Sequence, residues 1–212
     1  MYQPLIKFHP YPAIITQVLC IFVAMENYLE IAGAVVGFVY LWLEYKASIY
    51  LWIASVIMPA IYLVVFYDAG LYADTAINIY YLLIALYGFI AWRRGKDSGT
   101  ELKISHITVR QAVAMVALYA VLQVVISLLL LNFTDSTVPW FNGLTSALSV
   151  VGMWMLARKY IEQWIVWAVV DILSVGLYVY MGLYLTALLY AAYAIIAIFG
   201  YRKWQKLMKD EK

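Results

Sequence analysis

The segment EQWIVWAVVDILSVGLYVY, residues 162–180, decides the fold of this chain. After its first two residues it contains one acidic residue, Asp171, and no basic one. A helix needs roughly 20 mostly apolar residues to cross the hydrocarbon core of a bilayer, because each residue advances about 1.5 Å. The segment therefore predicts a membrane-spanning helix with a carboxyl group near its middle.

Most of the remaining chain consists of similar segments. Its 212 residues are 67% hydrophobic and 12% charged, whereas a soluble domain is about half apolar and a quarter charged. Too few charges remain to cover a water-facing surface. The sequence thus predicts an all-α membrane protein with seven transmembrane helices, at residues 27–43, 49–67, 71–92, 110–131, 140–157, 162–180 and 183–201.

The apolar stretch at residues 12–25 is shorter than a full span. It holds about 14 residues, a length that suits an interfacial or re-entrant helix. An eighth span is the alternative. Residues 1–26 therefore form an N-terminal segment in the predicted domain plan.

The basic residues indicate the orientation in the membrane. If residues 93–110 are cytoplasmic and the spans alternate, every Lys and Arg except Lys7 falls on the cytoplasmic side. The positive-inside rule then places the N-terminus outside and the C-terminus in the cytoplasm.

An internal repeat relates the two halves of the chain. A shift of 112 positions without gaps aligns Trp42 with Trp154, Trp52 with Trp164, Gly88 with Gly200, Trp92 with Trp204, and Lys46 with Arg158. Each copy covers three spans, and the fourth span returns the second copy to the same orientation.

This pattern predicts a 3+1+3 parallel repeat with a substrate site between the copies; a duplicated scaffold without a site is the alternative. The predicted units are residues 27–92, the loop and linking helix 93–139, residues 140–204, and a cytoplasmic tail at 205–212.

Asp171 is the strongest candidate for a substrate-binding residue. A charge inside hydrocarbon costs at least about 2.5 kcal/mol, and no Lys or Arg lies in the middle of any predicted span. A proton or a cationic ligand is therefore expected to neutralise it. Trp167 and Trp164 precede it by one and two turns on the same helix face. A buried Asp that serves only packing is the alternative.

Other polar or aromatic residues in the spans are further candidates. They lie on four other helices: Glu30, Asn78, Tyr81, Asn142, Thr145, Tyr190 and Tyr193. Asn78 and Tyr190 are repeat mates and are expected at the same depth. For the hydroxyl groups, helix packing is an equal alternative, and for Glu30 the alternative is an interfacial position.

Pro59 occupies in the second span the position that Asp171 occupies in the sixth. A proline inside a helix removes a backbone hydrogen bond and can kink the helix. Pro59 is therefore a hinge candidate for alternating access, with a static kink as the alternative.

Recognised catalytic motifs are missing from the sequence. It has no HExxH, P-loop, GxSxG or GxGxxG pattern, a single cysteine, and two histidines outside the predicted spans. The chain is therefore predicted not to be an enzyme, and no cofactor, metal ion or nucleic acid is expected as a partner.

Residues around the sixth span resemble the Pnu family of vitamin transporters. The resemblance rests on Trp164-Ile-Val-Trp167-Ala-Val-Val-Asp171, Gly182-Leu183-Tyr184 and Gly200-Tyr201-Arg202-Lys203-Trp204, and covers residues 27–204. It implies an enlarged version of the sugar-transporting SWEET fold, often trimeric. It also implies a facilitator whose vitamin is trapped by a cytosolic kinase.

One position departs from the nicotinamide riboside carriers (PnuC) of this family. They have W-x-x-x-N in the sixth span, whereas Trp167 is followed here by Asp171, and Asn78 stands where they place a substrate-contacting Gln. W-x-x-x-D and residues 134–140 resemble the thiamine branch (PnuT). The resemblance therefore favours thiamine, with nicotinamide riboside as the main alternative and another nucleoside or riboflavin after it. Thiamine and nicotinamide riboside both carry a cationic ring, so charge alone does not separate them.

Overall fold

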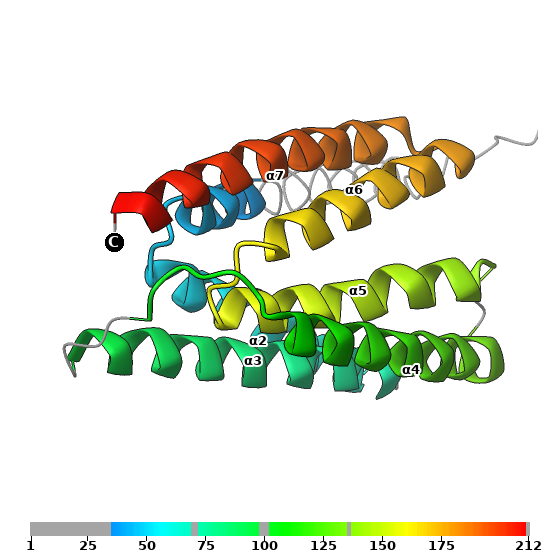
Figure 1. Ribbon diagram of the computed structural model, residues 1–212. Coiled ribbons are helices and arrows are strands. Elements are labelled where there is room, and N and C mark those ends of the chain that lie inside the picture. Colours follow the sequence, from blue (N-terminus) through cyan, green and yellow to red (C-terminus); the bar gives the residue numbers. More distant parts are fainter. Residues whose placement is uncertain (1–34, 69–71, 98–101, 135–136, 211–212) are drawn as a thin grey trace, which may run out of the picture. The chain divides into compact units, whose positions relative to one another are not determined.

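The computed structural model describes residues 35–68, 72–97, 102–134 and 137–210, and the regular structure in these ranges is helical (Figure 1). The helices are Val35–Tyr45, α2 (Tyr50–Asp68), α3 (Tyr72–Asp97), α4 (Val109–Phe133), α5 (Pro139–Ala157), α6 (Gln163–Tyr180) and α7 (Tyr184–Asp210). Four of their segments are long and apolar enough to cross a membrane: Thr75–Arg94, Val109–Phe133, Pro139–Ala157 and Gln163–Tyr180. The predicted all-α membrane fold class is confirmed. Glu30 and the apolar stretch 12–25 lie outside the described residues.

Two helices continue past their predicted ends. α3 reaches Asp97 and α7 reaches Asp210, although the apolar sequence stops near Trp92 and Tyr201. The extension of α7 contains Arg, Lys, Gln, Leu and Met, which favour helix, and no Gly or Pro. Hydropathy marks where lipid ends, whereas helix propensity decides where the helix ends.

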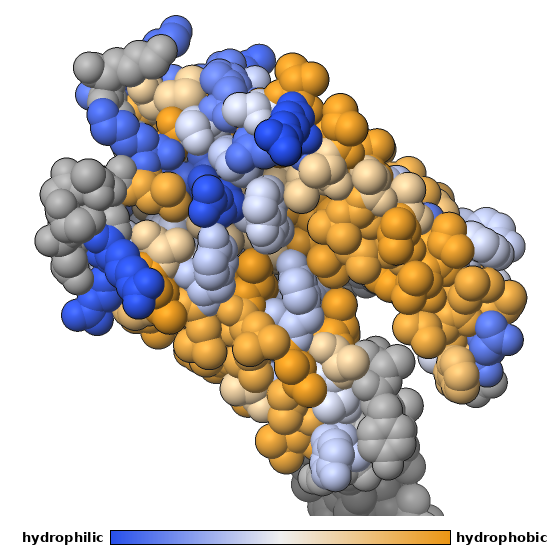
Figure 2. All heavy atoms as spheres, turned by 60° about the horizontal axis from the view of Figure 1, so that its bottom comes forward, coloured by the Kyte–Doolittle hydropathy of each residue, from blue (hydrophilic) through white to orange (hydrophobic). Residues whose placement is uncertain are grey.

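Residues 41–212 form one compact unit, and residues 1–40 are a separate one. Within the larger unit α2 packs on α3, α6 on α7, α4 on α5, α5 on α6, and α3 on α5. Its surface is largely apolar, with hydrophilic side chains gathered mainly toward one end of the face in Figure 2. On α4, Val113, Val116 and Val121 are 61–66% exposed. Such a surface is stable against lipid and not against water.

Two tight connections have the same backbone conformation. We call residues 42–52 the first elbow and residues 154–164 the second elbow. Ala47 and Lys159, which are repeat mates, both have left-handed backbone angles, with φ of 50° and 54°. Five backbone hydrogen bonds also recur at a shift of 112 positions. They run from residues 46, 47, 48, 51 and 52 to residues 42, 44, 43, 48 and 49 in the first elbow, at 2.9–3.2 Å, and between their repeat mates in the second.

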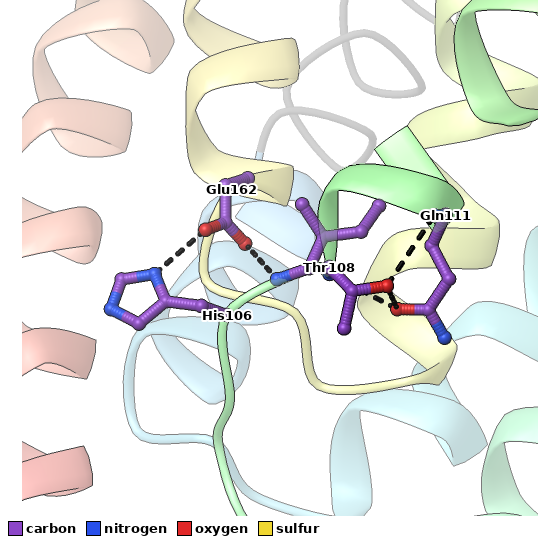
Figure 3. Close-up of polar contacts among 5 residues, drawn as sticks. His106, Thr108, Gln111 and Glu162 are labelled. Carbon is purple, nitrogen blue, oxygen red and sulfur yellow. Dashed lines mark hydrogen bonds and ion pairs between the residues drawn. The ribbon is translucent and has the colours of Figure 1, made fainter. Parts of the chain in front are cut away.

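A segment ahead of α4, which we call the strap (residues 102–108), is bonded to the second elbow (Figure 3). The amide of Ser105 donates to the Lys159 carbonyl at 3.1 Å, and the amide of Ile161 donates to the Ser105 carbonyl at 3.0 Å. The carboxylate of Glu162 lies 2.7 Å from His106 Nδ1 and accepts from the Ile107 amide at 3.0 Å. The strap therefore holds the residue directly before α6.

The strap leads into a well-capped helix α4. Thr108 and Gln111 form a capping box, in which each side chain bonds to the other residue's backbone amide (Figure 3). Gln111 Nε2 also donates to the Tyr160 hydroxyl at 2.9 Å. This second contact connects the start of α4 to the second elbow.

Candidate functional site

Asp171 lies on the buried face of α6. Its side chain is 7% exposed, and Ser174, one turn later, is 6% exposed. α7 packs against α6, and its residues Tyr190 and Tyr193 lie near Asp171. The structure thus brings together three candidates that the sequence placed on two different helices.

Three tyrosines of α6 and α7 form an aromatic cluster that includes the two tyrosines near Asp171. The rings of Tyr178 and Tyr190 stack with centroids 5.1 Å apart, and the rings of Tyr190 and Tyr193 meet at 5.8 Å. Tyr178 was not among the predicted site residues, although its position two turns after Asp171 is a usable signal. Aromatic faces next to a carboxylate attract a cationic ring.

Trp167 lies one turn before Asp171 and faces α5. A methyl group added at Gly152 would lie 3.4 Å from its indole ring. The Trp167 Nε1 atom is buried and has no hydrogen-bond partner among the residues that the structure describes. Because a buried donor without an acceptor is costly, this group is suited to donate to a ligand.

Candidates on α3 and α5 have mixed environments. Asn78 is buried, at 8% exposed, and its neighbours Tyr80 and Tyr81 have ring centroids 5.7 Å apart. The Tyr80 hydroxyl donates to the Val150 carbonyl at 2.7 Å, which attaches α3 to α5. Asn142 is half-buried on α5.

Three further predicted residues have surroundings that fit a structural role. The Thr145 hydroxyl donates to its own helix, to the carbonyls of residues 141 and 142 at 3.3 and 3.1 Å, in keeping with the packing alternative. Pro59 is half-buried within α2, which continues through it. Trp164 is 1% exposed and packs on Trp204, with ring centroids 5.8 Å apart.

Glu44 and Gln163 are buried polar residues that were not among the predicted site residues. Glu44 is 1% exposed and Gln163 is 0% exposed. Glu44 directly follows the first predicted span, and Gln163 is the second residue of the sixth, so neither stood out as a buried polar residue. Their burial depends on how the helix ends pack, which hydropathy does not report.

A helical bundle with a largely apolar outer surface and helices able to cross a bilayer is typical of a membrane protein. Residues 27–206 match the family described as nicotinamide mononucleotide transporter. The chain belongs to this family.

Relatives and a solved structure agree with this assignment. The chain is 25% identical to the nicotinamide riboside transporter PnuC of Escherichia coli (63% of this chain, 66% of that protein) and 30% identical to PnuC of Neisseria mucosa (66% and 57%). It is 26% identical to the riboflavin/roseoflavin transporter RibM of Streptomyces davaonensis (82% and 83%). The crystal structure of the vitamin B3 transporter PnuC is similar, with a TM-score of 0.68, 26% identity, and coverage of 97% and 95%. The matches to the two PnuC sequences span less than two thirds of those proteins.

The predicted Pnu-type membership is confirmed, and so is the prediction that the chain is not an enzyme, because the family and the structural neighbour are transporters. The preference for thiamine finds no support among these relatives, which are named for nicotinamide riboside and riboflavin.

Proposed function

We propose that this chain carries an unphosphorylated B vitamin with a flat, positively charged ring across a membrane by facilitated diffusion. The observation that carries the proposal is the buried Asp171 near Tyr190 and Tyr193, with the Tyr178 ring stacked on that of Tyr190. A carboxylate in a poorly hydrated site attracts a cation more strongly than it would in water. The aromatic rings add attraction to a cation and a surface on which a flat ring stacks.

Nicotinamide riboside is the first candidate substrate, because the relatives include transporters of that name and its pyridinium ring is a cation. Thiamine is the second candidate, because Asp171 follows Trp167 in the W-x-x-x-D pattern and the thiazolium ring is also a cation. Riboflavin, which one relative carries by name, has a neutral ring and would make less use of the carboxylate.

Each candidate residue has a proposed role. Asp171 attracts the cationic ring, Trp167 stacks on it or donates its free indole N–H, and Tyr190 and Tyr193 complete the aromatic wall. Additional contacts are assigned to Asn78, Tyr81, Asn142, Thr145 and Glu30, and Pro59 is the proposed hinge.

The wider arrangement is also part of the proposal. The two elbows with matching hydrogen bonds support a parallel 3+1+3 repeat that rocks about the site. The basic residues support an N-terminus outside and a C-terminus in the cytoplasm of a bacterial inner membrane. Assembly as a homotrimer and trapping of the vitamin by a cytosolic kinase complete the proposed uptake route.

Titration of the purified protein with nicotinamide riboside, thiamine and riboflavin, followed by tryptophan fluorescence, tests the proposal. Saturable binding of at least one cationic vitamin is expected. Asp171→Asn should weaken that binding about tenfold or more, because a hydrogen bond or contact with a charged group contributes about 1.5–3 kcal/mol. Asp210→Asn is the matched control, because it removes the same charge from an exposed position at the end of α7.

Three outcomes would contradict parts of this proposal. If none of the three vitamins binds, the substrate class is wrong. If Asp171→Asn binds the cationic vitamin as tightly as the parent protein, the role of Asp171 is wrong. If riboflavin binds much more tightly than both cations, the carboxyl group serves packing and the site selects a neutral ring.

A further inference from the structure

Four tryptophans form a continuous aromatic cluster, which we call the tryptophan cluster: Trp52 of α2, Trp92 of α3, Trp164 of α6 and Trp204 of α7. Trp52 meets Trp92 edge-on with ring centroids 5.5 Å apart, and Trp164 meets Trp204 edge-on at 5.8 Å. Trp92 and Trp204 join the two pairs at 6.5 Å. All four side chains are 0–4% exposed. The repeat relates Trp52 to Trp164 and Trp92 to Trp204, so the cluster takes one pair from each copy.

The tryptophan cluster lies between the Asp171 site and the basic ends of the helices. Trp164 precedes Asp171 by seven residues, about 10 Å along α6. Trp92 is followed at once by Arg93 and Arg94, and Trp204 follows Arg202 and Lys203. A ligand that leaves Asp171 toward the basic side would therefore meet these rings.

Two indole groups of the cluster connect one repeat to the other. Trp92 Nε1, in the first repeat, donates to the carbonyl of Ala157 in the second at 3.2 Å. Trp204 Nε1, in the second repeat, donates to the carbonyl of Glu44 in the first at 3.0 Å. These two bonds are nearly reciprocal, because the acceptors are offset by a single position in the repeat. They fasten the repeats together at the basic end.

Two glycines let the indole rings of Trp52 and Trp164 pack closely against the neighbouring helix of the same repeat. A methyl group at Gly88 would collide with the ring of Trp52, and one at Gly200 would lie 2.7 Å from the ring of Trp164. The rings therefore rest directly on the backbones of α3 and α7. Each repeat therefore contains a helix pair, α2 with α3 or α6 with α7, held together by one Trp ring packed on one Gly.

The closed cluster also contains buried polar atoms without hydrogen-bond partners, which make the closed state less favourable. The Nε1 atoms of Trp52 and Trp164, and both polar side-chain atoms of Gln163, are buried without a hydrogen-bond partner in the described part of the chain. Burying such groups without partners costs free energy. This cost disappears when the cluster opens, because water can then form hydrogen bonds with them. In a permanently closed scaffold, such buried groups are normally hydrogen-bonded. The closed state is thus held by two cross-repeat bonds and weakened by unpaired donors and an unpaired acceptor, as expected for a structure that opens.

We propose that the tryptophan cluster is the cytoplasmic gate of the transporter, latched by the Trp92–Ala157 and Trp204–Glu44 bonds. The proposal rests on the proposed function, because a gate requires transport by alternating access. Release of the vitamin breaks the two latch bonds, separates the Trp92–Trp204 contact and hydrates the buried indoles. Each repeat keeps its own Trp–Gly contact during this motion.

The test measures access to the site from the cytoplasmic side. Ser174→Cys is introduced with Cys20→Ser, so that one thiol reports on the buried face of α6 near Asp171. Inside-out membrane vesicles are treated with a membrane-impermeant thiol reagent, and the labelling rate is measured without any vitamin. Trp204→Phe keeps an aromatic ring but removes one latch bond, and should speed labelling about fivefold. Trp92→Phe, which removes the mirror bond, should act in the same direction.

Trp140→Phe is the matched control, because Trp140 is 53% exposed and lies outside the cluster; its labelling rate should equal that of the parent. If Trp204→Phe is lost from the membrane, Trp92→Phe carries the test. Unchanged labelling in every latch variant that reaches the membrane would overturn the gate and make the cluster a static pivot. Because no vitamin is added, this result is independent of which vitamin binds.

Discussion

The first and second elbows share a backbone but differ in what holds them. Both have a left-handed residue at the same repeat position and the same five backbone hydrogen bonds. Only the second is described with the strap bonded to it, through Ser105 and Glu162. Tyr50, the repeat mate of Glu162, is instead 64% exposed. The two elbows thus share a local turn, whereas the segment ahead of α4 gives the second elbow an additional support.

This difference has a consequence for movement. The strap holds the start of α6, the helix that carries Asp171, whereas α2 carries Pro59 and begins at an elbow without that support. We therefore expect the binding helix to be the steadier of the two equivalent helices. Motion between the repeats should be concentrated in the first.

The largest effect is expected where the two repeats are most alike. Gly88→Ala and Gly200→Ala each place a methyl group against a buried indole that has no room to move. Each should lower the free energy of unfolding by about 1–3 kcal/mol. Gly176→Ala in α6 meets no atom within 4 Å and should be neutral or stabilising by up to about 1 kcal/mol. Thermal unfolding in detergent measures all three variants. Unchanged stability of the Gly88 or the Gly200 variant would contradict the close packing there.

An intermediate effect should separate the two elbows. Glu162→Ala removes the acceptor of the Ile107 amide and the contact with His106. The hydrogen bond contributes about 1 kcal/mol, and the His106 contact adds little because that ring is 57% exposed. Amide hydrogen exchange over residues 102–111 should accelerate about fivefold.

The matched control for this change is Tyr50→Ala at the equivalent position of the first elbow, which should leave exchange in the strap unchanged. In the parent protein the first elbow should exchange faster than the second. Equal protection of the two elbows would show that the strap adds no local stability.

The smallest effect concerns the left-handed residues. Ala47→Gly should stabilise the protein by about 1 kcal/mol, because a side chain makes this conformation unfavourable and glycine does not. Lys159→Gly should gain less, because the Lys159 ammonium lies 4.6 Å from the Trp92 ring centroid and that attraction is lost. Equal gains in unfolding free energy would mean that this cation–π contact contributes nothing.

Much of the fold was predictable because a membrane span is a local property. Residues 162–180 marked α6 to within one residue of its start, since about 20 apolar residues suffice to cross a bilayer. The site was predictable in part for the same reason, because a carboxyl group in an apolar segment is conspicuous wherever it packs. Trp164 shows the limit: its spacing placed it on the Asp171 face, but its ring belongs to the tryptophan cluster.

By itself the sequence determined the helical membrane fold class and the family, and it predicted the repeat and a site at Asp171, all of which depend on composition and on spacing along one chain. Only the tertiary structure showed that Tyr190 and Tyr193 lie near Asp171, that four tryptophans from both repeats meet, and that Glu44 and Gln163 are buried. These features depend on contacts between residues far apart in the chain. Packing between helices decides them, and hydropathy along one helix carries no information about its neighbours.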